Sequence, residues 1–310
     1  FARCTAAAMV AVGLIPGPAV AEPAEARQVT DGVYFVEGAR GETGPGNLGR
    51  VGNVGFLVGP TGVVVIDTGV SHAHGRDLLA ALRRVTPLPV DRVVLTHAVQ
   101  EFLYGTTAFV DAGARPVTHV KSAELMRARC EHCLENLRLI LGDTAMAGTR
   151  LVVPEDTVDT DHGMLTAGGR TVDLIHPGWA STPGDLMVLD RATGVLFSGG
   201  VLTNRRVPDL RDGRLDDWVR AIDAIVTLPI RAIVPGHGAP MQPGDAAETR
   251  RYLTELDRHA RALYARGLSL MEALDAAELP EFSAWDAYEA LHRKNLQQRY
   301  LEVELEDLER

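Results

Sequence analysis

The stretch VGFLVGPTGVVVIDTG, residues 54–69, decides the fold of this 310-residue chain. Two apolar runs flank a Pro-Thr-Gly turn, which is the pattern of two buried strands joined by a short connection. A helical stretch follows from about His74 to Val85. A run of β-branched residues from Val90 to Leu95 then ends at Thr96 and His97. The sequence therefore places polar groups directly after two buried strands.

Four short motifs continue this arrangement along the chain. They read THAVQEFLYG at 96–105, STPGD at 181–185, LFSGG at 196–200 and PGHG at 235–238. In order and spacing they resemble the T-H-x-H-x-D-H, H-T-x-G-D, L-F-x-G-D and P-G-H-G motifs of the metallo-β-lactamase superfamily, over roughly residues 28–245. The resemblance implies an α/β fold, the αβ/βα four-layer sandwich, in which two mixed sheets face each other with helices outside.

The tail of the chain carries a narrower resemblance. Residues 284–303 and 142–150 look like those of exported metallohydrolases linked to quinoprotein (PQQ-dependent) pathways and of SoxH-like proteins. This resemblance implies an exported protein that works beside a quinoprotein relay or a sulfur-oxidation system, with a metal-binding motif that is degenerate in this chain. Its partner would be a small-molecule ligand or a periplasmic protein.

Three segments are expected along the chain. Residues 1–21 are interpreted as a signal peptide with a truncated start, because small residues precede a cleavage site after Ala21. The alternative for this segment is a disordered alanine-rich terminus. Residues 28–245 form the metallo-β-lactamase-like domain, and residues 246–310 form a C-terminal helical extension. The signal peptide predicts an exported, periplasmic protein.

Composition narrows the class of protein. The chain is 46% hydrophobic and 23% charged, so it can bury a large core. The formal net charge of −10 without a basic cluster argues against a nucleic-acid partner. The apolar run within residues 5–20 is short and contains two prolines, so no membrane span is expected in the mature chain.

The resemblance implies where metal ligands would stand. In the family the first zinc ion takes three histidines, the second takes an aspartate and two histidines, and a further aspartate bridges them. The matching positions are His97, Val99 and Ser181 for the first ion, Glu101, Phe102 and His237 for the second, and Gly200 for the bridge. Valine and phenylalanine have no donor atom, and a serine hydroxyl is a poor zinc ligand. We therefore expect a lost di-zinc centre whose cleft is lined by Val99, Phe102, Ser181 and Gly200.

A remodelled site is the alternative. His97, Glu101 and His237 supply two imidazoles and a carboxylate, the ligand set of a mononuclear catalytic zinc. Without such an ion, His97 would hydrogen-bond at a strand end and His237 would stabilise a turn. No cofactor is expected apart from that one zinc ion. Candidates for a catalytic role are Glu101, Asp67 and Asp185, although in the family the positions of both aspartates brace the site through hydrogen bonds.

Two further features are open to more than one interpretation. Cys130 and Cys133 share the apolar face of a predicted helix, which favours buried thiols over a local disulfide or a metal site. The glycine-rich segment Arg40 to Gly52 is predicted to be a mobile loop, either contacting a substrate or serving as a plain connector.

Three functions therefore remain open. The first is a non-catalytic or altered homologue that binds a small molecule or a partner. The second is an active zinc hydrolase of ester, thioester or lactam bonds that uses the mononuclear site. The third is an interaction subunit that docks through its C-terminal helices, from about Asp245 to Arg310. Whether the protein is an enzyme is left open by the sequence.

Overall fold

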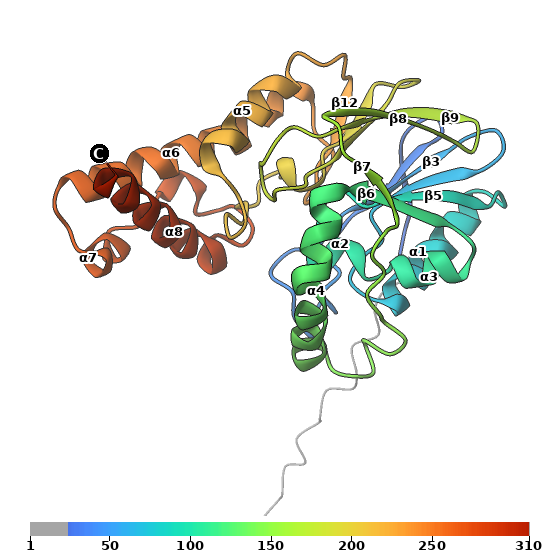
Figure 1. The fold of residues 1–310 in the computed structure, drawn as a ribbon, viewed down its shortest axis with the longest axis horizontal. Coiled ribbons are helices and arrows are strands. Elements are labelled where there is room, and N and C mark those ends of the chain that lie inside the picture. Colours follow the sequence, from blue (N-terminus) through green and yellow to red (C-terminus); the bar gives the residue numbers. More distant parts are fainter. Residues whose placement is uncertain (1–23, 310) are drawn as a thin grey trace, which may run out of the picture.

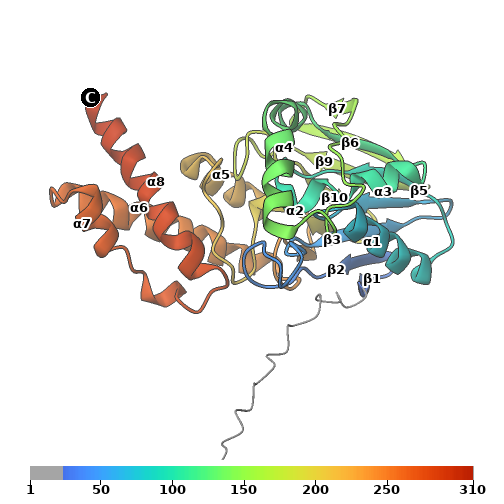
Figure 2. The same ribbon diagram turned by 90° about the horizontal axis from the view of Figure 1, so that it is seen from below.

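The structure is a computed structural model that describes residues 24–309. The expected signal peptide, residues 1–21, lies outside the described residues. Two sheets form the centre of the molecule, and helices cover their outer faces (Figures 1 and 2). This arrangement confirms the predicted mixed α/β sandwich.

The first sheet has seven strands in chain order. They are β1 (Arg27–Thr30), β2 (Val33–Val36), β3 (Val54–Val58), β4 (Val63–Ile66), β5 (Val90–Val94), β6 (Arg115–His119) and β7 (Asp156–Val158). Strands β1 to β4 pair antiparallel, whereas β4 to β7 pair parallel. The apolar runs on either side of the Pro-Thr-Gly turn are β3 and β4, as the sequence predicts.

The second sheet has five strands in the order β12-β11-β10-β9-β8. They are β8 (His162–Ala167), β9 (Arg170–Ile175), β10 (Met187–Asp190), β11 (Val195–Phe197) and β12 (Ala232–Val234). The two sheets share a buried core that includes Leu57 and Ile66 from the first and Leu174 and Phe197 from the second. A Cβ at Gly55 would lie 2.1 Å from the Phe197 ring, so a glycine on β3 lets the sheets approach closely.

Helices form the two outer layers. The helices that cover the first sheet are α1 (His72–Val85), α2 (Gln100–Leu103), α3 (Thr106–Asp111) and α4 (Val120–Leu141). Those on the side of the second sheet are α5 (Leu215–Ile225), α6 (Ala246–Ala265), α7 (Leu270–Asp275) and α8 (Tyr288–Leu308). Short 3-10 helices lie between these elements at η1 (Gly199–Val201), η2 (Pro243–Asp245) and η3 (Pro280–Phe282).

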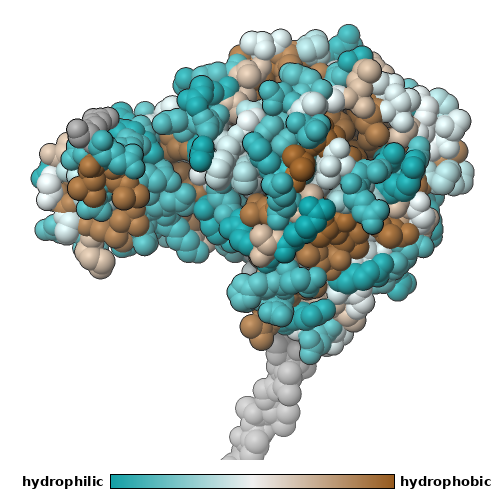
Figure 3. All heavy atoms as spheres, viewed as in Figure 1, coloured by the Kyte–Doolittle hydropathy of each residue, from teal (hydrophilic) through white to brown (hydrophobic). Residues whose placement is uncertain are grey.

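The C-terminal helices project to one side of the sheets (Figures 1 and 2). Their inner faces share one buried cluster with α5 and the second sheet, so they pack on the sandwich. Hydrophobic atoms gather over α7 and α8 at the left of Figure 3, and these helices carry the exposed Met271, Leu305 and Leu308. No helix within residues 24–309 is long and apolar enough to cross a membrane.

Candidate functional site

A cavity of about 220 Å³ opens where strands of both sheets end. Its lining comes from the segment before β3, from the residues after β5, from the Ser181 loop after β9 and from the turns after β11 and β12. The sequence-predicted residues that line it are His97, Val99, Glu101, Phe102, Ser181, Gly200 and His237. Tertiary folding thus brings together all seven positions that the resemblance identifies, over 140 residues of sequence.

Asp67 lies behind the cavity and positions His97. Its carboxylate accepts hydrogen bonds from the Thr96 backbone N–H at 2.8 Å and from the Thr96 Oγ1 hydroxyl at 2.7 Å. Because that hydroxyl donates to Asp67, it accepts from Nδ1 of His97 at 2.6 Å, which leaves Nε2 as the unprotonated ring nitrogen. Burial raises the pKa of Asp67 to about 7 and lowers the pKa of His97 to about 3.

Asp185 braces the Ser181 loop in the same way. Its carboxylate accepts from Ser181 Oγ at 2.7 Å, from the Thr182 backbone N–H at 2.9 Å and from Thr182 Oγ1 at 3.0 Å. Burial raises the pKa of Asp185 to about 6, although these hydrogen bonds oppose the rise. The Ser181 hydroxyl hydrogen is therefore committed to Asp185. Neither Asp67 nor Asp185 lines the cavity.

Phe102 fills the region between the retained histidines. Its fully buried ring lies 4.4 Å from the His97 ring and 5.3 Å from the His237 ring, measured between centroids. At Gly200, an added Cβ would lie 2.3 Å from Ser181 Oγ and 3.0 Å from Nε2 of His97. The site therefore has an apolar ring at one ligand position and no room for a bridging aspartate without rearrangement.

These side chains do not fit a two-zinc centre. The donor set near the ring of Phe102 is reduced to His97, Glu101 and His237. Within residues 24–309, no group of three or more His, Cys, Asp or Glu side chains is placed to hold a metal ion.

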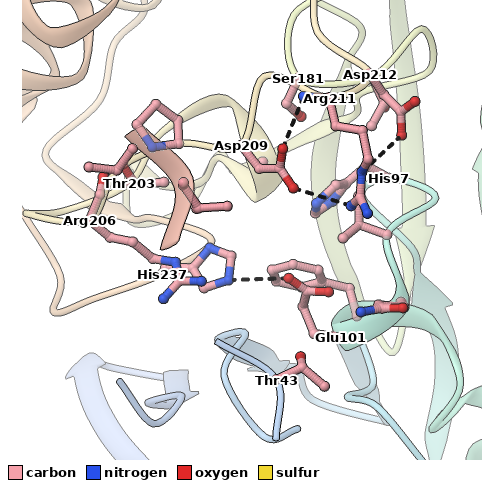
Figure 4. A pocket seen from close by; sticks show the side chains of 18 of the residues that line it. Thr43, His97, Glu101, Ser181, Thr203, Arg206, Asp209, Arg211, Asp212 and His237 are labelled. Carbon is pink, nitrogen blue, oxygen red and sulfur yellow. Dashed lines mark hydrogen bonds and ion pairs between the residues drawn. The ribbon is translucent and has the colours of Figure 1, made fainter. Parts of the chain in front are cut away.

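Glu101 and His237 face each other across the floor of the cavity (Figure 4). The distance from Nε2 of His237 to Oε1 of Glu101 is 3.6 Å, and both side chains are 13% exposed. Among the described residues, this Nε2 is buried and makes no hydrogen bond. Burial would raise the pKa of Glu101, but the neighbouring His237 and Arg206 hold it below its usual value.

Arg206 fixes the glycine-rich segment against the cavity. Its guanidinium donates to Glu42 Oε1 at 2.6 Å, to Asp286 Oδ2 at 2.7 Å and to the Gly41 carbonyl at 2.8 Å. The Gly41 backbone N–H donates to Asp286 in turn. The segment predicted to be mobile is thus held by hydrogen bonds to residues distant in sequence, and its Glu42 and Thr43 line the cavity.

A charged loop before α5 adds to the lining, as do single side chains of α4, α5 and α8. Asp209, Arg211 and Asp212 lie at one side of the cavity, with Arg206 and His237 at another (Figure 4). Arg211 approaches Asp209 at 3.3 Å and Asp212 at 4.0 Å. Sequence reasoning did not assign Arg206 or Arg211 to the site. The dense run of charges in VPDLRDGR, residues 207–214, is the signal that could have found this loop.

Comparisons with known proteins agree with this fold. The sequence profile of the "Metallo-beta-lactamase superfamily" matches residues 48–237. The linear primary-alkylsulfatase of Pseudomonas sp. (strain ATCC 19151) is 24% identical over 268 residues, which cover 73% of this chain and 49% of that protein. The chain therefore spans about half the length of the curated relative it matches.

Solved structures of other proteins share this fold. A metallo-beta-lactamase from Pontibacter korlensis has a TM-score of 0.61 and 22% identity, covering 74% of this chain and 99% of that one. A stereoselective inverting sec-alkylsulfatase from Pseudomonas sp. has a TM-score of 0.68 and 18% identity, covering 90% of this chain and 50% of that one. Residues 1–245 make up less than four-fifths of the chain, whereas the alkylsulfatase match covers 90% of it. The likeness to the alkylsulfatase therefore extends into the C-terminal helices.

Proposed function

This chain belongs to the metallo-beta-lactamase superfamily, and on that premise we propose that its cavity binds a small polar molecule without a di-zinc centre. The observation that carries the proposal is the packing of the Phe102 ring against both His97 and His237. An apolar ring at that position supplies no ligand atom and takes the space of an imidazole. The fold and its cleft are retained, whereas the donor set of the family is reduced.

The charge of the cavity indicates the class of ligand. Four carboxylates line it, and two guanidiniums oppose them. Arg206 is held by Glu42 and Asp286, so it is not free to bind an anion. Glu101 differs from Glu42, which is paired with an arginine. Among the described residues, the one basic side chain paired with Glu101 is His237. We therefore propose that the ligand carries an amine or another hydrogen-bond donor that reaches Glu101.

A matched pair of ligands tests this class. Hexylammonium and hexyl sulfate share an alkyl chain and differ in the sign of the charged group. We expect the ammonium ligand to bind at least about tenfold more tightly in calorimetry, since a difference of about 1.4 kcal/mol is within reach of one partly buried ion pair. The sulfate is an informative competitor, because the similar Pseudomonas proteins are named as alkylsulfatases. Tighter binding of the sulfate would contradict the proposal.

A mononuclear zinc hydrolase is the second candidate. It is favoured by one observation, the buried Nε2 of His237 that makes no hydrogen bond within residues 24–309. Elemental mass spectrometry of the protein purified without chelator separates the two candidates, with His97→Ala and His237→Ala as matched variants. Metal-free, folded protein supports the ligand-binding proposal. Near-stoichiometric zinc that both substitutions abolish would support the hydrolase instead.

The cellular setting is a separate proposal. We propose that the protein is exported and works in the periplasm beside a quinoprotein or sulfur-oxidation system. The support is the likeness of residues 1–21 to a signal peptide and of residues 284–303 to the exported quinoprotein-linked group. Fractionation of cells that express the full-length gene tests it, because export predicts a mature protein in the periplasmic fraction that begins near Glu22. Full-length protein in the cytoplasmic fraction would contradict it.

A further inference from the structure

Helix α4 carries two thiols one turn apart, Cys130 and Cys133. Both are free within the described residues. Cys130 is 3% exposed and belongs to the core beneath the first sheet, whereas Cys133 is half-buried at the edge of the same core. One thiol is therefore shielded from solvent, and its neighbour is partly exposed.

Two arginine side chains, Arg129 and Arg211, act on the partly exposed thiol through their charge. Arg129 lies in the preceding turn of α4 and forms an ion pair with Asp212 at 2.9 Å, which links α4 to the charged loop of the cavity. The pKa of Cys133 is lowered to about 6, chiefly by a hydrogen bond with Cys130 and also by the charges of Arg211 and Arg129, although burial opposes the shift. The same hydrogen bond and burial raise the pKa of Cys130. The two thiols thus have different environments.

We propose that Cys130 and Cys133 form a redox-active dithiol in which Cys133 is the attacking thiol and Cys130 the resolving one. The co-reactant is a small-molecule disulfide, RSSR. The Cys133 thiolate attacks one sulfur of RSSR, so that a Cys133–SR bond forms and RS⁻ leaves. The Cys130 thiol then attacks the Cys133 sulfur and passes its proton to the departing sulfur, which leaves as RSH. In total the protein loses two protons and two electrons, and RSSR takes them up to become two RSH.

Helix geometry makes this disulfide easy to reduce. Residues three apart on a helix have Cβ atoms about 5–6 Å apart, whereas a disulfide needs about 3.5–4.5 Å. The backbone of α4 must therefore adjust when the bond forms, and a strained disulfide has a more oxidising potential. The pair is consequently suited to reversible exchange. This inference goes beyond the proposed ligand and does not depend on it.

The test uses the full chain with Cys4→Ser, so that only the two α4 thiols remain. The folded protein is equilibrated with mixtures of oxidised and reduced glutathione, quenched with acid and alkylated. Trypsin releases both cysteines in one peptide, Cys130–Arg138, which carries two alkyl groups when reduced and none, with two hydrogens fewer than the free dithiol, when the disulfide has formed. We expect this loss to appear in oxidising mixtures and to reverse in reducing ones.

Two single variants in the same background test the order of attack. Cys130→Ala should retain Cys133 and accumulate a mixed disulfide with glutathione. Cys133→Ala should retain the shielded Cys130 and stay reduced. At pH 6, Cys133 in the folded Cys4→Ser protein, which keeps its hydrogen bond with Cys130, should be alkylated about tenfold faster than in the same chain unfolded, because a lowered pKa raises the thiolate fraction more than it lowers nucleophilicity.

Two results would overturn the proposal. One is a disulfide that forms only in denaturant, with none in the folded Cys4→Ser protein at any glutathione ratio. The other is faster glutathionylation of Cys133→Ala than of Cys130→Ala, which would make Cys130 the reactive thiol. The measurement on the protein with both thiols stands even if a single variant fails to fold.

Discussion

The Nε2 atom of His237 lies 3.6 Å from Oε1 of Glu101, just beyond hydrogen-bonding distance. The two residues are separated by more than 130 positions and come from the first and last motifs of the chain. Both side chains are mostly buried at the floor of one cavity. The His237 imidazole and the Glu101 carboxylate can therefore form further hydrogen bonds with a ligand in the cavity.

Glu101→Gln should weaken binding of an ammonium ligand and leave the fold intact. Glutamine keeps the shape of the side chain but removes its charge, so we expect a loss of about tenfold in affinity, or roughly 1.4 kcal/mol. Titration calorimetry with hexylammonium measures it. The matched control is Glu248→Gln on the exposed side of α6, which should bind like the parent protein. Equal affinity of all three proteins would argue against contact between the ligand and Glu101.

Gly200→Ala should destabilise the protein by about 1–3 kcal/mol, because the new methyl group would lie 2.3 Å from Ser181 Oγ. Ser181→Ala removes that oxygen, so the double variant should recover part of the loss. Urea unfolding of the parent, both single variants and the double variant gives the coupling between the two sites. Strict additivity would show that the two positions do not compete for the same space.

Arg206→Ala should destabilise the protein by about 3 kcal/mol, since it removes the cation of Glu42 and leaves Asp286 with the longer contact to the exposed Arg40. It should also speed proteolytic cleavage between Arg40 and Gly52, the segment that Arg206 holds. Arg205→Ala is the control, because the neighbouring side chain is exposed. Unfolding curves and limited proteolysis measure both effects. Similar behaviour of the two variants would contradict the role of Arg206 in fixing the loop.

The stability contributed by Asp67 should fall as pH rises. Burial raises the pKa of Asp67 to about 7 in the folded protein, above the ordinary value of 3.8 that applies to the unfolded chain. Between these values the folded state binds more protons than the unfolded state, so the free energy of unfolding decreases with increasing pH. The Asp67 contribution is on the order of 3 kcal/mol from pH 4 to pH 7. Asp67→Asn should flatten this part of the stability curve.

Asp190→Asn should change the pH dependence of stability in the opposite direction from Asp67→Asn. Burial alone would raise the pKa of Asp190, but hydrogen bonds from Arg170 and Thr193 outweigh it and hold the pKa below its usual value. This carboxylate stabilises the fold at neutral pH, and its contribution is lost as pH falls through the lowered pKa. The substitution should therefore cost stability at pH 7 and progressively less as pH falls below the ordinary value of 3.8. Parallel stability curves for the Asp67 and Asp190 variants would contradict both assignments.

Local patterns explain why so much of the fold follows from the sequence. The β-branched runs at 63–66 and 90–94 become β4 and β5, and the predicted helix from His74 becomes α1. A strand or helix of this kind is set by residues a few positions apart, so its signal is complete within a short window. The export signal, the domain boundaries and the link to a quinoprotein system stay predictions.

The sequence by itself determined which residue types stand at the motif positions, and hence that Val99 and Phe102 offer no metal ligand. Only the tertiary structure decided that the Phe102 ring contacts both His97 and His237, and that Arg206 joins Gly41 to Asp286, 245 positions away. Chemical identity is a property of each residue and is readable in order along the chain. Contacts over such separations depend on how two sheets and their helices pack, because packing is a cooperative property of the whole core.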